Sequence, residues 1–399
     1  MKNILLLTNI YPTEDPKYPG TKICHFFTKE WQKMGYNVRV VHYESCFPKI
    51  YYAIGGLLGE KIMAKTGSLV DMTTPREAVQ YKVEGIKVCR VPLKKYFPHG
   101  SIPKKSEAEA FEATTHFLQS EQFEPDVISA HFFFPQAQFL HKLKRLYPKA
   151  RTCMVMHSNG ETIPKYYKDY KPLMESIDIW GFRSNSFKTQ FEGLFGPQSR
   201  EFLCYSGIPS EYIQPQNRDF KDGIKKFVFL GSLYKLKNVD ITLNALSEVY
   251  KNGDYTFDVI GDGAELGALK KLTAKLKQER QVVFHGRQSR DKAQSIMAGA
   301  DCFVMVSSRE AFGLVYLEAM AKGIIPVATI GQGFDGIIVN GHNGFLCPSR
   351  DVKALEKVLL QMRSLSADKL KVISQNAVAT AKELTNEKAA EKYIQEILK

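Results

Sequence analysis

Long apolar runs and paired cysteines are both missing from this sequence of 399 residues. No uncharged apolar run reaches about eighteen residues, so the sequence contains no candidate for a membrane-spanning helix. The seven cysteines include no C-x-x-C pair, which argues against a zinc site and against a disulfide framework. The first apolar run ends at Tyr11-Pro12, too early for a secretion signal, and we therefore expect a cytoplasmic protein.

Acidic residues are outnumbered, because 55 lysines and arginines against 42 aspartates and glutamates give a formal net charge of +13. Such a charge suits a polyanionic partner, which could be nucleic acid, an anionic lipid surface or a phosphorylated small molecule. A solvated basic surface explains the same charge. No helix-turn-helix, RNP-like or zinc spacing is present, so the sequence favours no nucleic-acid partner.

Short apolar runs alternate with longer amphipathic stretches along most of the chain. Residues 3–8, 20–34 and 37–42 show this rhythm first, and a second series begins at 226–230. Alternation of this kind is typical of βα units and a parallel sheet. Between the two series, residues 213–223 are polar and can bury little. The sequence thus predicts an α/β protein with two doubly wound, Rossmann-like domains facing a central cleft, with ligands beyond the carboxyl ends of the strands.

The segment 307–327 carries the strongest chemical signal. An apolar strand ends at Val306, a small polar loop follows, and a helix begins near Gly313. Without a side chain, Gly313 lets the first amides of the helix approach a phosphate or a sugar hydroxyl. Glu318 would accept hydrogen bonds from neutral hydroxyls such as a ribose diol, and Glu310 would face the sugar. Taken singly, these glutamates could also be a capping acid and a solvated helix residue.

This segment resembles the E-x7-E signature of retaining glycosyltransferases of family 4, which have the GT-B fold. Other family landmarks follow in order along nearly the whole chain, including looser matches upstream at P-D-V-I with His131, at V-M-H-S-N-G with His157 and at Y-S-G-I-P. The closer matches are F-L-G-S-L at 229–233 followed by Lys237, V-I-G-D-G at 259–263, V-F-H-G at 283–286 and G-H-N-G-F-L at 341–346.

The resemblance implies both domain roles and site residues. Residues 1–212 would bind the acceptor, 213–223 would form a linker, 224–383 would bind the nucleotide sugar, and a terminal helix over 384–399 would cross back to the first domain. It assigns catalytic roles to Glu310, His157 and Lys237, nucleotide-sugar binding to Ser232, Lys237, Gly286, Arg287, Gly313, Leu314 and Glu318, and an acceptor loop to Gly20.

The chain departs from the family pattern at the first glycine-rich turn. Ser232 stands where the family usually carries an arginine, so Lys235 or Arg287 would have to replace that phosphate-binding cation. Pro209 stands where an acid is usual, at a position that mainly shapes a loop. No D-x-D metal motif occurs, and we expect neither a metal nor another cofactor.

The resemblance implies a retaining, metal-independent hexosyltransferase. It would move a sugar from a nucleotide-diphosphate sugar to a saccharide or polyprenyl-linked acceptor in cell-surface polysaccharide biosynthesis. A sugar-nucleotide epimerase or a phosphorylase of the same fold, and a basic nucleic-acid-binding protein, are the alternatives.

Two segments of the first domain suggest a membrane-bound acceptor. The basic helix end over 141–149 would place the enzyme on the inner face of the membrane, with Lys142, Lys144, Arg145 and Lys149 meeting anionic lipid and Leu143, Leu146 and Tyr147 interleaved. The apolar stretch 46–70 would be either a loop for a lipid acceptor or an insertion packed on its own core.

Overall fold

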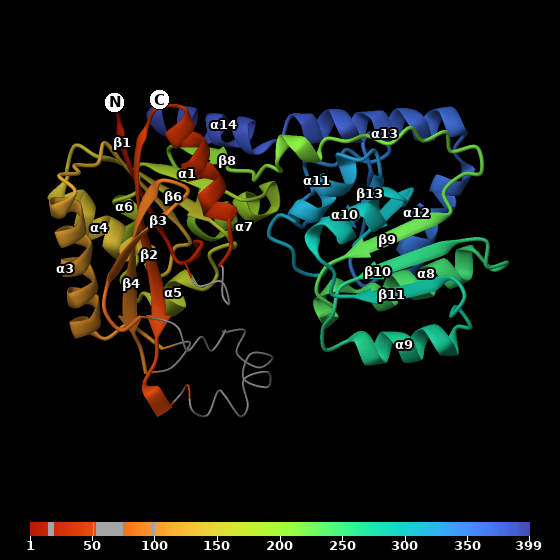
Figure 1. The fold of residues 1–399 in the computed structure, drawn as a ribbon, viewed down its shortest axis with the longest axis horizontal. Coiled ribbons are helices and arrows are strands. Elements are labelled where there is room, and N and C mark those ends of the chain that lie inside the picture. Colours follow the sequence, from red (N-terminus) through yellow and green to blue (C-terminus); the bar gives the residue numbers. More distant parts are fainter. Residues whose placement is uncertain (15–19, 51, 53–74, 97–99) are drawn as a thin grey trace. The chain divides into compact units, whose positions relative to one another are not determined.

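The computed structural model describes residues 1–14, 20–50, 52, 75–96 and 100–399 (Figure 1). Most of the apolar stretch 46–70 therefore lies outside the described residues. The chain divides into two compact units, each built on a mainly parallel sheet with helices. The first unit comprises Met1–Phe182, Phe191–Cys204 and Ala390–Lys399, and the second comprises Arg183–Gln190 and Tyr205–Ala389.

The first unit contains an eight-stranded sheet in the order β3-β4-β2-β1-β5-β6-β7-β8. All neighbouring strands pair in parallel except β3 and β4. Strands in the middle of such a sheet are covered on both faces, which explains the continuous apolar run of β1. The strands are β1 (Asn3–Thr8), β2 (Asn37–Cys46), β3 (Val79–Val83), β4 (Ile86–Lys94), β5 (Val127–His131), β6 (Arg151–Met156), β7 (Ile179–Phe182) and β8 (Glu201–Leu203).

The hairpin of β3 and β4 was not predicted from the sequence. Glu84 and Gly85 connect the two strands, and both have positive φ, at 47° and 87°. Two such residues form the tight turn whose twist matches a β-hairpin. The sequence pattern showed only the stretch 87–91, because β3 is largely exposed and lacks an apolar run.

The helices of the first unit follow the predicted alternation with the strands. On one flank of the sheet, α3 and α4 are joined by an ion pair of 2.6 Å between Lys142 and Glu107 (Figure 1). The helices are α1 (Ile23–Lys33), α3 (Lys104–Ser120), α4 (Gln136–Leu146), α5 (Ile163–Tyr166), α6 (Lys171–Glu175), the later part of α7 (Asn185–Phe195) and the later part of α14 (Asn386–Leu398).

The end of α14 completes the core of the first unit. The indole of Trp31, which is fully buried, donates to the carbonyl of Ala390 at 3.0 Å. The hydroxyl of Tyr393 lies 2.5 Å from the hydroxyl of Ser129 and 3.2 Å from Nε2 of His131. Residues more than 250 positions apart in the chain thus share one buried cluster.

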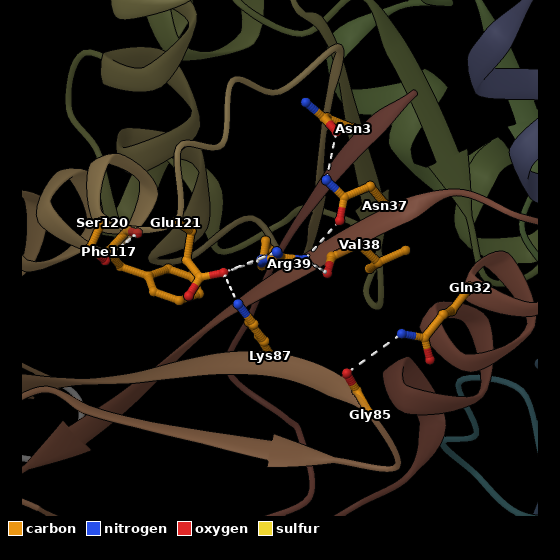
Figure 2. Close-up of polar contacts among 10 residues, drawn as sticks. All are labelled: Asn3, Gln32, Asn37, Val38, Arg39, Gly85, Lys87, Phe117, Ser120 and Glu121. Carbon is orange, nitrogen blue, oxygen red and sulfur yellow. Dashed lines mark hydrogen bonds and ion pairs between the residues drawn. The ribbon is translucent and has the colours of Figure 1, made fainter. Parts of the chain in front are cut away.

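Polar side chains join the amino ends of β1, β2 and β4 (Figure 2). Asn37 donates to the side chain of Asn3 at 2.8 Å, and Arg39 donates to that of Asn37 at 2.8 Å. Glu121, just after α3, then receives Arg39 at 2.9 Å and Lys87 at 2.5 Å. Both cations of this cluster contact the carboxylate of Glu121. The cluster therefore links neighbouring strands at the amino edge of the sheet, opposite the edge where ligands bind.

The second unit contains a six-stranded parallel sheet in the order β11-β10-β9-β12-β13-β14. Helix α8 (Val239–Val249) packs one apolar face inward, since Val239, Leu243, Leu246 and Val249 are all buried. The strands are β9 (Lys226–Leu230), β10 (Thr256–Ile260), β11 (Val282–Gly286), β12 (Cys302–Val304), β13 (Ile325–Thr329) and β14 (Phe345–Cys347).

Three helices of the second unit, α10, α12 and α13, begin after a residue whose side chain caps the helix. Ser289, Asp351 and Ser366 each accept a hydrogen bond from a first-turn amide, the usual N-cap arrangement. Residues 352–398 are almost entirely helical, in α12, α13 and α14. The elements are α8 (Val239–Val249), α9 (Leu266–Lys275), α10 (Arg290–Ala298), α11 (Leu314–Met320), α12 (Val352–Ser364), α13 (Ala367–Lys382) and the 3-10 turns η1 (Ser210–Tyr212) and η2 (Lys235–Lys237).

The domain limits inferred from the resemblance stay a prediction. The polar stretch 213–223 contains neither helix nor strand. The division into compact units falls earlier in the chain, between Cys204 and Tyr205.

Candidate active site

An open cavity of about 790 Å³ lies at the carboxyl edge of the second sheet. Its wall begins where β9, β10 and β11 end and continues over α10 and α11, all within the second unit. Ligands of doubly wound sheets bind at this edge. The cavity is lined by Leu230, Gly231, Ser232, Tyr234, Ile260, Gly261, Asp262, Arg287, Gln288, Arg290, Ala293, Gln294, Leu314, Val315 and Glu318.

Two glycine-bearing loops form part of this wall by packing closely on each other. The amide of Gly231 donates to the carbonyl of Ile260 at 3.0 Å. Gly261 has φ +144°, and a Cβ atom there would stand 1.8 Å from the carbonyl oxygen of Gly231. A Cβ atom at Gly263 would stand 2.5 Å from the oxygen of Leu233. The contact between the two backbones therefore requires both glycines of the G-D-G motif.

Glu318 is a buried carboxylate in the wall of the cavity. It lies in α11 with 7% of its surface exposed. One of its oxygens accepts from Nη2 of Arg290 at 2.6 Å and the other from Nε2 of Gln294 at 2.5 Å. Burial raises the pKa of Glu318, and the charge of Arg290 opposes that rise. The two donors hold the carboxylate in a fixed orientation.

Arg290 was not predicted as a site residue from the sequence. It is the first residue of α10, and it lines the cavity beside Arg287, which was predicted. Its Nε donates to the hydroxyl of Tyr212 at 2.5 Å, and its guanidinium lies 5.1 Å from the centre of that ring. Tyr212 lies 78 positions earlier in the chain, so the sequence carries no local sign of this contact.

Lys237 and Glu310 form an ion pair of 2.6 Å, with both side chains about four-fifths buried. Asn238, which follows η2 with φ 51°, fixes the position of Lys237 relative to Glu310. Its side-chain amide donates to the carbonyl of Val306 at 2.7 Å and to the hydroxyl of Ser308 at 2.8 Å. The turn that carries Lys237 is thus bound to the loop that leads to Glu310.

The two cations considered as replacements at the phosphate position differ in their surroundings. Lys235 forms an ion pair of 2.8 Å with Asp240, and its side chain is 67% exposed. Arg287 lines the cavity next to Gln288. The geometry therefore favours Arg287 over Lys235 as the cation that accompanies Ser232.

Gly313 and Gly286 sit at turns next to the cavity wall. Gly313 has φ +87° and precedes α11, and a Cβ atom there would stand 2.6 Å from the ring of Tyr316. Gly286 ends β11 with φ +65°. Their neighbours Leu314 and Arg287 both line the cavity. The helix start predicted near Gly313 is confirmed.

His157 and Gly20 belong to the first unit. His157 follows β6, with its Nε2 3.0 Å from Nδ1 of His131 and its ring stacked on Phe132 at 3.9 Å. Gly20 lies between β1 and α1 with φ +67°, and a Cβ atom there would stand 2.3 Å from the carbonyl oxygen of Tyr11. Both follow the carboxyl ends of their strands. His131, the partner of His157, is fully buried.

The chain is similar to known proteins in both sequence and fold. Residues 212–380 match the family model of group 1 glycosyl transferases. The structure of Anabaena Alr3699/HepE in complex with UDP has a TM-score of 0.68 and 17% identity, covering 100% of this chain and 99% of that one. The fold is GT-B. The predicted pair of Rossmann-like domains is thus confirmed, and GT-B is the fold that the resemblance implied.

Relatives in sequence are named as glycosyl-transferring enzymes. The N-acetyl-alpha-D-glucosaminyl L-malate synthase of Bacillus anthracis is 30% identical over 249 residues, which are 59% of this chain and 65% of the relative. The putative colanic acid biosynthesis glycosyltransferase WcaL of Escherichia coli (strain K12) is 22% identical over 267 residues, 64% of this chain and 66% of WcaL. The chain thus spans about two thirds of the length of each. The matched family model and the names of these relatives are those of enzymes that transfer glycosyl groups, and they do not favour the epimerase alternative.

Proposed function

We propose that this protein transfers a hexosyl group from a nucleotide-diphosphate sugar to a saccharide or a lipid-linked saccharide. The cavity at the carboxyl edge of the second sheet carries this proposal. It combines an oriented carboxylate, Glu318, with two arginines, Arg287 and Arg290, and a wall of closely packed backbone. A carboxylate accepts hydrogen bonds from a ribose diol, and arginines suit a diphosphate. HepE, which shares the fold, was crystallised with UDP.

Departure of the nucleoside diphosphate is the step that most needs help from the protein. Negative charge grows on the leaving phosphate, and fixed cations stabilise it without reorganising. We assign this role to Lys237 and Arg287, without a metal ion or another cofactor. Lys237 forms an ion pair with Glu310, so this pair would have to open or share its cation with the phosphate.

Retention of configuration rests on the E-x7-E resemblance of Glu310 and Glu318. In this proposal Glu310 contacts the transferred sugar and His157 lines the sugar site from the first unit. The backbone near Gly286 and Arg287 would contact the base. We place the reaction in polysaccharide biosynthesis, the process named for WcaL.

A panel of nucleotide sugars tests the donor directly. A donor at one hundred times its Kd stabilises the folded state by about 2.7 kcal/mol, which raises the melting temperature by several degrees. Retention is then tested by NMR of the anomeric proton in the first product formed. If no nucleotide-diphosphate sugar raises the melting temperature of the folded enzyme, the proposal fails.

The proposed membrane contact involves the basic end of α4. Within the described ranges, no helix has the length and apolar character needed to cross a bilayer. Leu143 is fully buried in the core, and Lys142 and Lys144 pair with Glu107 and Asp178. Leu143 and the other buried residues of this helix face the protein, whereas Leu146 is 49% exposed, and the membrane contact stays a proposal.

Arg145 and Lys149 remain to meet anionic lipid on the inner face of the membrane. At about 1 kcal/mol for each cation, we expect weak pelleting with anionic vesicles at low salt and release at higher salt, since screening acts within about 8 Å. The charge-removing variant Arg145→Gln with Lys149→Gln should stay in the supernatant. Equal pelleting of wild type and variant would contradict the assignment of these two residues.

A further inference from the structure

Helix α10 carries two hydrogen-bond donors that meet the buried carboxylate of Glu318 in the second-unit cavity. Arg290 and Gln294 have the i, i+4 spacing that places both side chains on the same face of a helix. Arg290 donates to one oxygen of Glu318 at 2.6 Å, and Gln294 donates to the other at 2.5 Å. The carboxylate therefore cannot rotate without breaking a bond to α10.

The amide of Gln294 is oriented at a cost in stability. Its nitrogen faces Glu318, while its carbonyl oxygen Oε1 is buried and has no hydrogen-bond partner among the described residues. A buried acceptor without a partner destabilises the folded state, because its hydrogen bond to water is not replaced. Turning the amide over would place this oxygen against the carboxylate. The observed orientation therefore serves Glu318.

Arg290 is held in turn by Tyr212, the last residue of the turn η1. Nε of Arg290 donates to the hydroxyl of Tyr212 at 2.5 Å, and the guanidinium lies 5.1 Å from the centre of that ring. The side chain of Arg290 is 60% exposed, and an exposed ion pair gains little when both side chains must lose conformational freedom to form it. The contact with Tyr212 restricts Arg290, so its bond to Glu318 requires less additional ordering.

The charge of Arg290 also affects the protonation of Glu318. Burial raises the pKa of the Glu318 carboxyl, and Arg290 opposes this rise most strongly. Gln294 acts in the same direction through its hydrogen bond, and Lys322, which follows α11, does so through its charge. Protonation would turn one oxygen of the carboxyl into a donor. Arg290 therefore helps to keep Glu318 an acceptor.

Glu318 keeps acceptor capacity on both of its oxygens. A carboxylate offers about four acceptor sites, roughly two on each oxygen. Arg290 and Gln294 use part of this capacity on different oxygens, which leaves a site on each for a ligand in the cavity. Such a pair of sites suits two adjacent hydroxyls, as ribose carries at its 2′ and 3′ positions.

We propose that Arg290 and Gln294 are positioning residues that prepare Glu318 to bind both hydroxyls of a nucleotide ribose, and that Tyr212 holds Arg290 in place. This inference rests on the proposed donor site and adds the residues that act through Glu318. A 2′-deoxy nucleotide would leave one oxygen of Glu318 without its ligand partner, so the site selects ribonucleotides.

The protonation of Glu318 tests the proposal without any ligand. Glutamate carboxyls labelled with carbon-13 are followed by NMR across pH, and the resonance absent from Glu318→Gln is that of Glu318. Arg290→Met should raise the pKa of this carboxyl by about one pH unit or more, since a neighbouring opposite charge is lost. The matched control is Lys292→Met, which removes an exposed positive charge from the same helix and should leave that pKa unchanged.

Nucleotide binding tests the orientation of Glu318. UDP, GDP and ADP are titrated into the full chain by calorimetry, and the tightest of them is compared with its 2′-deoxy form. Wild type should prefer the ribonucleotide at least about tenfold, since the deoxy form lacks a hydrogen bond to a charged group. Arg290→Met and Gln294→Leu should lose most of this preference, and Tyr212→Phe, which keeps the ring, should lose part of it.

Arg290→Lys separates charge from position, because lysine keeps the charge and lacks the planar fork. It should hold the pKa of Glu318 close to that of wild type and still weaken the ribose preference. Arg290→Gln serves if the methionine variant does not fold. An unchanged pKa of Glu318 without Arg290, or an unchanged ribose preference in the folded Arg290 and Gln294 variants, overturns the proposal. Wild type that binds none of the three nucleotides contradicts the proposed function instead, and the pKa measurement still decides whether Arg290 acts on Glu318.

Discussion

A cavity of about 270 Å³ lies at the carboxyl edge of the first sheet, and the larger cavity described above lies at the same edge of the second sheet. The two cavities differ in which atoms form their walls. The second-unit cavity owes its shape to backbone, since Gly261 must lie against Gly231. The first-unit cavity is made by side chains such as Asn9, Glu44 and Tyr166, which come from distant parts of the chain. A backbone wall restricts which residue can stand at each position and leaves a motif in the sequence. A wall made of side chains can be altered by single substitutions to suit another ligand, so it leaves no motif in the sequence.

Both cavities nevertheless contain a glutamate oriented by an arginine. Glu318 is held by Arg290, and Glu44 is held by Arg90. In each case the carboxylate is fixed before a ligand arrives, which lowers the entropic cost of binding. The two cavities therefore differ mainly in the atoms that form their walls. They differ less in the groups that could hydrogen-bond to ligand hydroxyls.

Gly261→Ala attacks the backbone wall and should have the largest effect. The new Cβ atom would overlap the carbonyl of Gly231, so that the loops must separate. We expect a loss of about 3 kcal/mol or more in the free energy of unfolding, together with loss of donor binding. Chemical denaturation and calorimetry measure the two effects.

Gly267→Ala is the matched control, because a Cβ atom there meets no heavy atom of the described residues within 4 Å. This glycine lies inside α9, where alanine should stabilise the helix by up to about 1 kcal/mol. Equal stability of the Gly261 and Gly267 variants would mean that the backbone contact does not shape the cavity.

Lys237→Ala tests the electrostatic part of the second site. We expect turnover to fall on the order of a hundredfold, because a fixed charge near the leaving phosphate is lost. Lys235→Ala should retain near wild-type turnover, since that lysine pairs with Asp240. Steady-state kinetics decide between the two lysines, and wild type should keep its activity in a chelator. An absolute need for Mg²⁺ would contradict the metal-free mechanism.

Glu318→Ala should weaken donor binding while the protein stays folded. We expect roughly a tenfold loss of affinity, the effect of removing charged hydrogen bonds to ligand hydroxyls. Calorimetric titration with the donor measures the loss, and circular dichroism checks the fold. An unchanged donor affinity would remove Glu318 from the binding site.

His42, which is buried in β2, should make the first unit sensitive to acid. Burial lowers its pKa to about 3, and repulsion from Arg90 adds to the decrease. An unfolded chain protonates this histidine near pH 6.5, so the stability it provides is present above pH 6.5 and is lost as the pH falls towards 3.

The loss from His42 should reach at most about 1.4 kcal/mol for each pH unit. Urea denaturation between pH 7 and 5 should show a smaller slope in His42→Gln than in wild type. The outcome against this account is a parallel pH dependence in the two proteins.

Most strands and helices could be predicted from the sequence, because a parallel sheet leaves apolar runs and an amphipathic helix leaves a period. The E-x7-E region was recognisable because its glycine and glutamates are close in the chain. Arg290 was not predicted, since it acquires its role from contacts with residues such as Tyr212, 78 positions earlier in the chain. Leu143 shows a further limit, because a helix that faces the core and one that faces a membrane share the same periodicity.

The return of the chain in α14 links folding of the first unit to the order of synthesis. Trp31 and Ser129 are made early, but their partners Ala390 and Tyr393 follow 359 and 264 residues later. Until residues 390–399 have left the ribosome, the buried indole of Trp31 lacks its cover, and chaperones that bind apolar surface would find it there. Removal of those ten residues would leave the same opening permanently, so that a truncated protein would be a target for proteases.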